Sequence, residues 1–209
     1  LASWMLFSWS SINPTYTAIN VVEAVVGALL LRKLLPWYNP LQNLNDWIRL
    51  AIGSALIPPL VGGVLVHFLV PTSEPLRNFL VWVLSEAIGA LALVPLGLLF
   101  KPHYLLRHRD PKLLLETLVT MAVTLMLSWA SITWLPWPFT CVIVLLMWSA
   151  VRLPRMEAFM VFLVTVMVVS LMIARNPTAL TTQHTNAMLN APWLPFLMLL
   201  LPANVMTMV

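Results

Sequence analysis

Residues 76–100, LRNFLVWVLSEAIGALALVPLGLLF, decide the class of this fold. A helix rises about 1.5 Å per residue, so a stretch of this length can cross the roughly 30 Å of hydrocarbon in a bilayer. Only Arg77 and Glu86 are charged within it. We therefore expect a transmembrane helix here and not a helix from the core of a soluble protein.

The composition of the whole chain supports a membrane protein. Of the 209 residues, 61% are apolar and 9% are charged, whereas a soluble domain has about half apolar and about a quarter charged residues. The net charge of +4 comes from too few basic residues to form a nucleic-acid-binding face. A single cysteine, Cys141, provides neither a disulfide framework nor a metal-ligand pair. No Ser/His/Asp arrangement, P-loop or HExxH motif is present, so we expect no catalytic residue, metal or cofactor in this chain.

Six further apolar segments flank residues 76–100. The expected spans are 15–35, 46–70, 76–100, 113–135, 138–153, 156–174 and 193–209. Twelve of the 17 prolines lie at or between their ends, where the missing N–H group costs no helical hydrogen bond. The segments are continuously apolar and not alternating, which indicates helices and not strands of a β-barrel. The sequence thus predicts an all-α polytopic transmembrane helix bundle of about seven spans, in which the short segment 138–153 could also be re-entrant.

The basic residues predict the orientation of the bundle. One set of alternate loops holds nine: Arg32, Lys33, Arg49, Lys101, Arg107, Arg109, Lys112, Arg152 and Arg155. The other set holds only Arg77 and Arg175. Short cytoplasmic loops carry the excess of Lys and Arg, so the C-terminus should be cytoplasmic and residues 1–14 should form an external segment. Because the chain begins at Leu1 and ends within an apolar stretch, we expect the membrane domain at 15–209 to be truncated at both ends.

Two carboxylates lie well inside expected spans, Glu23 in 15–35 and Glu86 in 76–100. A charged carboxylate at the bilayer centre costs at least about 2.5 to 3.5 kcal/mol, so such groups usually face other helices. Gly27 and Gly89 lie about one helical turn further on, which places each carboxylate on a face suited to close helix approach. Glu23, Gly27, Glu86 and Gly89 are therefore candidates for sensing an input or for packing helices through hydrogen bonds.

The span 46–70 contains two helix-disrupting pairs. Pro58 and Pro59 remove backbone donors, and Gly62 and Gly63 remove steric bulk. These four residues are a candidate hinge; a plain kink and a cavity lined by free carbonyl groups are the alternatives.

Four segments resemble a known family. They are residues 19–33 (INVVEAVVGALLLRK), 82–95 (WVLSEAIGALALVP), 137–139 (WPF) and 147–152 (MWSAVR). Their pattern is similar to the membrane-associated sensor domain of the first type, the MASE family. More narrowly, residues 34–50 and 93–115 resemble enteric bacterial diguanylate cyclases that carry this sensor ahead of PAS repeats and a GGDEF domain.

The resemblance implies a function and a set of partners. It implies an integral-membrane sensory or anchoring domain of a bacterial signal-transduction protein, located in the inner membrane. In the full-length parent it would regulate a cytoplasmic diguanylate cyclase, which makes cyclic-di-GMP. The implied partners are the lipid bilayer and C-terminal cytoplasmic PAS and GGDEF domains, and a second copy of the chain is a further candidate partner. Half of a small-molecule or ion transporter and a purely structural membrane anchor remain the alternatives.

Overall fold

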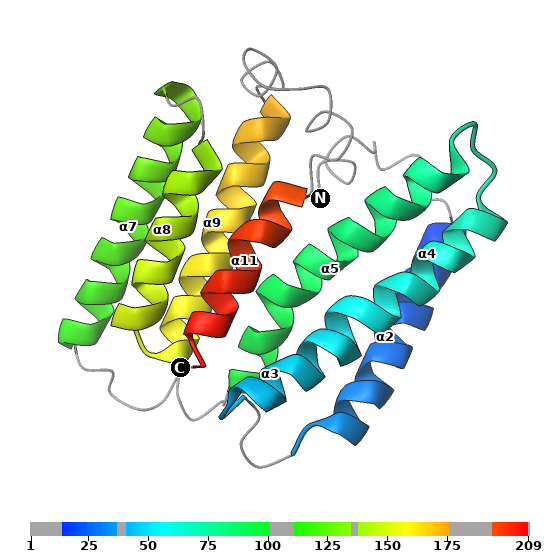
Figure 1. Cartoon of the computed structure of the whole chain (residues 1–209), viewed down its shortest axis with the longest axis horizontal. Coiled ribbons are helices and arrows are strands. Elements are labelled where there is room, and N and C mark those ends of the chain that lie inside the picture. Colours follow the sequence, from blue (N-terminus) through cyan, green and yellow to red (C-terminus); the bar gives the residue numbers. More distant parts are fainter. Residues whose placement is uncertain (1–13, 37–40, 101–110, 135–137, 176–193, 209) are drawn as a thin grey trace. The chain divides into compact units, whose positions relative to one another are not determined.

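The computed structural model describes residues 14–36, 41–100, 111–134, 138–175 and 194–208, and within these ranges it is helical and contains no strand (Figure 1). The helices are α2 (Pro14–Leu34), α3 (Leu44–Leu50), the π-helix η2 (Ala51–Leu56), α4 (Ile57–Leu69), α5 (Pro75–Leu99), α7 (Pro111–Trp134), α8 (Pro138–Arg152), α9 (Arg155–Arg175) and α11 (Leu194–Met206). The prediction of an all-α fold is confirmed for the described part of the chain. The expected external segment, residues 1–14, lies outside it except for Pro14.

Five segments are long and apolar enough to cross a membrane. They are α2, the continuous run Leu44–Leu69, α5, α7 and Arg155–Met172 of α9. The other two expected spans are shorter: α8 has 15 residues and α11 has 13. At about 1.5 Å per residue both fall short of the roughly 30 Å hydrocarbon layer. The multi-pass architecture is therefore confirmed, whereas the count of seven spans is not established.

Prolines begin four of the helices, as their positions in the sequence predict. Pro14, Pro75, Pro111 and Pro138 are the first residues of α2, α5, α7 and α8. The first turn of a helix has no intrahelical partner for its N–H groups, so proline costs nothing there.

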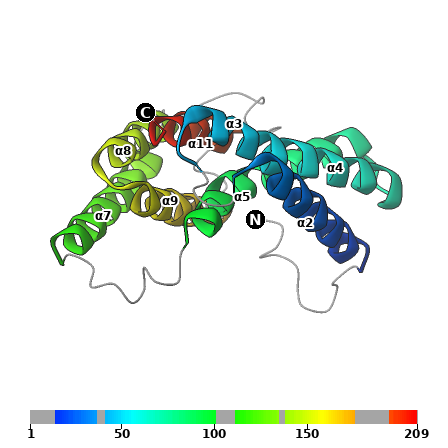
Figure 2. The ribbon, with the colours of Figure 1, turned by 90° about the horizontal axis from the view of Figure 1, so that it is seen from below.

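The chain divides into two compact units, Leu1–Leu91 and Ala92–Val209. In the first unit α2 packs against η2 and α4, and Figure 2 shows α3 leading through η2 into α4. Ile19, Leu50 and Val66 are almost completely buried in this unit. The first unit also contains α5 as far as Leu91.

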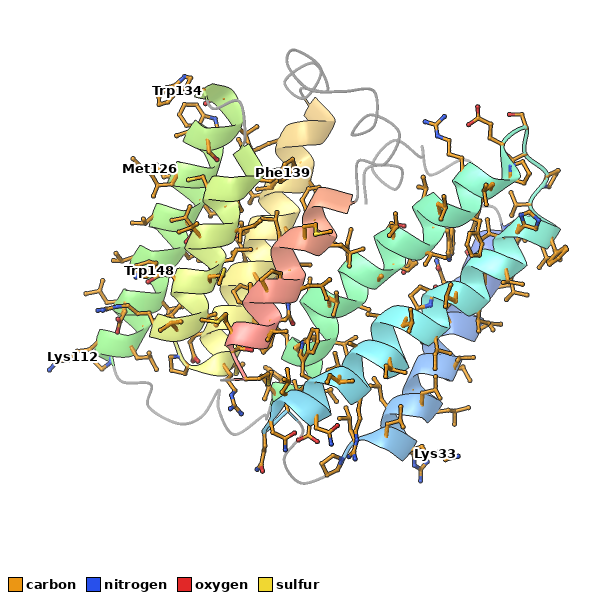
Figure 3. All side chains as sticks on the ribbon, viewed as in Figure 1. Lys33, Lys112, Met126, Trp134, Phe139 and Trp148 are labelled. Carbon is orange, nitrogen blue, oxygen red and sulfur yellow. The ribbon has the colours of Figure 1, made fainter. Side chains whose placement is uncertain are left out.

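The second unit contains the end of α5, from Ala92, together with α7, α8, α9 and α11. In it α7 packs against α8 and α9, and α11 packs mainly against α8. Its core contains Phe159 and Phe162, whose rings meet edge to face with centroids 5.5 Å apart. Large apolar side chains such as Met126 and Trp134 are exposed on its outside (Figure 3). An apolar exterior is expected where the solvent is lipid.

Candidate functional site

Glu23 lies on the interior face of α2. The buried residues of that helix are Ile19, Glu23 and Gly27, which follow one another at intervals of four and therefore form one stripe. Only 7% of Glu23 is exposed. The indole Nε1–H of Trp82 on α5 donates a hydrogen bond of 2.7 Å to its Oε1 atom. The carboxyl group thus links two helices that are far apart in the sequence.

Gly62 on α4 provides the space for this carboxyl group. A Cβ atom at Gly62 would overlap the carboxyl of Glu23, so the carboxyl lies directly against the backbone of α4. At the neighbouring Gly63, a Cβ would lie 2.6 Å from Val83 and 2.9 Å from Phe79 of α5. The two glycines therefore accept side chains from two different helices.

An aromatic stack holds the indole ring of Trp82. Tyr16, near the start of α2, lies nearly parallel to Trp82, with ring centroids 5.5 Å apart and an interplanar angle of 14°. Tyr16 and Glu23 are seven residues apart, which is two helical turns, and so share a face of α2. Both thus contact the same indole, one by stacking and one by a hydrogen bond, and this restricts the directions in which its N–H can point.

Glu86 follows Trp82 by one turn of α5 and is half-buried. The structure therefore places Glu86 on the same side of α5 as Trp82, whose indole donates to Glu23.

The two prolines of the second span lie at a widened turn and not at a break. Pro58 and Pro59 are buried at the start of α4, directly after the π-helix Ala51–Leu56. In that segment the N–H of Ile57 bonds to the carbonyl of Ile52, five residues back. Such a turn lets the helix continue where proline lacks the donor for the usual bond. The helical run therefore continues to Leu69.

Close helix packing occurs beside these prolines. A Cβ at Gly27 would lie 3.4 Å from Cγ of Pro58, in ordinary contact distance, and 3.8 Å from the carbonyl oxygen of Gly53. A Cβ at Gly53 would lie 3.3 Å from Leu34. Small residues on facing helices thus allow α2 to approach η2 and α4 closely.

Comparison with known proteins identifies the family. The model of the MASE1 family matches residues 1–208. The chain belongs to the MASE1 family. This confirms the family resemblance and makes the chain a membrane domain of the sensor class.

One curated relative of this MASE1 domain is the probable diguanylate cyclase DgcE of Escherichia coli (strain K12). The two are 72% identical over 208 residues, which cover 100% of this chain and 19% of the relative. The chain thus spans about a fifth of the length of that protein. No solved structure matches the chain.

Gly89 lies one turn after Glu86 on α5. Within the part of the MASE1 domain that the structure describes, a Cβ added at Gly89 meets no heavy atom within 4 Å. In the first unit, α5 contacts its neighbours through the side chains of Phe79, Trp82 and Val83. The packing role of Gly89 stays a prediction.

Sequence reasoning missed the role of Trp82 in the MASE1 domain. An indole N–H in a membrane span needs an acceptor, and a buried carboxylate is the strongest one available. No spacing in the sequence indicates this bond, because Trp82 and Glu23 lie 59 residues apart. The stacking of Tyr16 on Trp82 has no sequence signal either, because it depends on how α2 and α5 pack.

The described residues contain no group of three or more His, Cys, Asp or Glu side chains that could hold a metal ion. The polar groups of the site are two carboxyls, an indole N–H and a tyrosine. Such groups can exchange hydrogen-bond partners between helices.

Proposed function

We propose that this chain is the membrane input domain of a bacterial signalling protein, and that it regulates a diguanylate cyclase in the same polypeptide. The carrying observation is the hydrogen bond from Trp82 to Glu23, which lies over Gly62 and so joins α2, α4 and α5 at membrane depth. The MASE1 family and the diguanylate cyclase name of the DgcE relative support this function. The catalytic step would occur in domains outside this chain.

The polar contact suits a switch between two helix arrangements. A sensor needs two states that differ in their free energy of interaction with the input. In membrane proteins a hydrogen bond between helices contributes about 0.6 to 2 kcal/mol, so an input that competes for it can change the populations of two close states. Glu86 is the next carboxylate on α5, one turn after Trp82.

The proposed orientation has the C-terminus in the cytoplasm of a bacterium, with the domain in the inner membrane. Lys33 lies at one end of α2, and Lys112 lies at the start of α7 (Figure 3). These ends, with Arg152 and Arg155, belong to the loops that hold nine of the eleven basic residues. The excess of basic residues in short loops is typical of the cytoplasmic side.

The output would leave the domain through α11. Arg155, the first residue of α9, donates from Nε to the carbonyl oxygen of Thr207 at 3.0 Å. This bond ties the end of α11 to the start of α9, next to the basic residues. We propose that movement of α11 passes the signal to PAS and GGDEF domains that follow it, and that the lipid bilayer and a second copy of the chain are the other partners.

The test measures cyclic-di-GMP in cells that express the full-length protein. The variants are W82F and E23A, with W148F as the matched control, because Trp148 is an exposed tryptophan on α8. We expect both site variants to change the cyclic-di-GMP level several-fold at equal membrane abundance, and W148F to leave it unchanged. If all three variants match the unaltered protein, the contact only packs helices.

A domain exchange separates a sensor from an anchor. Residues 14–208 are replaced by an unrelated multi-span bundle, and cyclic-di-GMP is measured again under growth conditions that change the output of the unaltered protein. Loss of the response supports the input function. A preserved response would assign the domain an anchoring role alone.

A further inference from the structure

The buried face of α7 is formed almost entirely by hydroxyl side chains. Its buried residues are Thr117, Thr120, Thr124, Ser128, Ser131 and Ile132. The hydroxyl residues follow one another at steps of three or four, which keeps them on one face of the helix. The opposite face is apolar and exposed, with Leu115, Val119 and Met126 among its residues. The helix is thus polar towards the protein and apolar towards lipid.

The hydroxyls at the two ends of this face bond to the helix itself. Thr117 donates to the carbonyl of Leu113 at 2.8 Å, and Ser131 donates to the carbonyl of Ser128 at 3.0 Å. The middle of the face differs. Thr124 and Ser128 are completely buried, and their hydroxyl oxygens have no hydrogen-bond partner.

A third hydroxyl without a partner lies on the neighbouring helix. Thr165 of α9 is 1% exposed, and α9 packs against α7. Among the described residues, the hydroxyl oxygens of Thr124, Ser128 and Thr165 are the only buried side-chain nitrogen or oxygen atoms that have no hydrogen-bond partner. We call these three residues, together with Thr120, the hydroxyl seam.

The members of the hydroxyl seam lie at similar depth. Both α7 and α9 run in the same direction, because α8, which connects them in the chain, runs in the opposite direction (Figure 1). Thr124 lies about 20 Å from the start of α7, and Thr165 lies about 15 Å from the start of α9, at about 1.5 Å per residue. Both positions are near the middle of the second unit, far from water at either membrane surface.

The chemistry of the seam selects the ligand. Burying a hydroxyl group costs free energy when the group loses its hydrogen bonds to water and forms no others. Lipid hydrocarbon cannot supply a hydrogen-bond partner. The seam contains no charged group, so it offers nothing that would select an ion. Water is small, and it both donates to and accepts from hydroxyl and carbonyl groups.

We propose that the hydroxyl seam, the buried unpartnered hydroxyls of the two packed helices α7 and α9 with Thr120, binds ordered water inside the membrane domain. A water-bridged contact can re-form its hydrogen bonds when helices shift, so α7 and α9 can move relative to each other without leaving hydroxyls unpaired.

The test is water-edited solid-state NMR of the whole chain in lipid bilayers, with threonine and valine labelled with carbon-13. Thr72, which is exposed between α4 and α5, is the wet reference. Val66 and Val142, which are buried on α4 and α8, are the dry references. The variants T124V and T165V assign the two threonine signals. We expect Thr124 and Thr165 to gain magnetisation from water several-fold faster than the valines. Transfer as slow as that of the valines would show a dry seam and overturn the proposal.

A second measurement uses the triple variant T124V/S128A/T165V and the control T133V. Thr133 lies on the same helix but is exposed, and it donates to the carbonyls of Trp129 and Ala130. We expect the triple variant to reduce the transfer from water to Thr120 several-fold, and T133V to leave it unchanged. An unchanged Thr120 signal in a folded triple variant would overturn the proposal.

Discussion

The carboxyl group of Glu23 on α2 lies where a Cβ atom would be placed at Gly62 on α4. The two helices are therefore in contact through this carboxyl group, which packs directly against the backbone of Gly62. Gly62 is needed for space and not for conformational freedom, since the helix around it is regular. This pair separates two kinds of glycine in the first unit. A side chain at Gly62 would displace the carboxyl group of Glu23. A Cβ atom at Gly89 would have no heavy atom within 4 Å among the described residues.

The variants G62A and G89A should therefore have opposite effects on stability. G62A should destabilise the domain by about 1 to 3 kcal/mol, because the carboxyl of Glu23 must move from its buried position. G89A should stabilise it by up to about 1 kcal/mol, because alanine is the better helix former. The free energy of unfolding in lipid nanodiscs measures both. Equal stability of the two variants would contradict the placement of Glu23.

Trp82 and Glu23 should be coupled energetically. W82F leaves the carboxyl without its donor, and E23A leaves the indole N–H without its acceptor, so each should cost about 1 to 3 kcal/mol. The double variant should lose less than the sum of the two single variants, because the same bond is removed in both. E23Q should be milder than E23A, since the amide oxygen can still accept from the indole. Additive losses in this double-mutant cycle would show that the bond contributes nothing.

Arg155 should control the order at the end of α11. In R155A the carbonyl of Thr207 loses its donor, so residues 204–208 should exchange their amide hydrogens several-fold faster. The control is R77A, because Arg77 is exposed and pairs with Glu74, the residue before α5. Amide exchange followed by mass spectrometry measures both variants. Equal amide exchange in R155A and in the unaltered protein would contradict the proposal that α11 passes the signal to the following domains.

The orientation can be tested with topology reporters. A fluorescent protein that folds only in the cytoplasm should be bright when fused after residue 208. An alkaline phosphatase that is active only outside the inner membrane should be active when inserted at residues 72–74, between α4 and α5. The opposite pattern at the two positions would reverse the orientation inferred from the nine basic residues.

The positions of the helices could be predicted from the sequence because the membrane restricts them strongly. The stretch 76–100 corresponds to α5 at Pro75–Leu99, and 113–135 corresponds to α7 at Pro111–Trp134. A backbone in lipid must satisfy its own hydrogen bonds, so a long apolar segment has hardly any alternative to a helix. Prolines then mark the ends of these segments. The same argument placed Glu23 and Glu86 on helix faces that avoid lipid.

The partners of those residues were decided by the tertiary structure alone. Glu23 and Trp82 are 59 residues apart, and no periodicity within one helix predicts which indole meets which carboxyl. The roles of Gly62 and Gly89 differ for the same reason, because they depend on what the facing helix presents. The hydroxyls of α7 could be read from their spacing, but only the packing of α7 against α9 shows which of them lack a partner. Helix formation in a membrane is a local requirement of the backbone, whereas contacts between helices depend on side chains from distant parts of the chain.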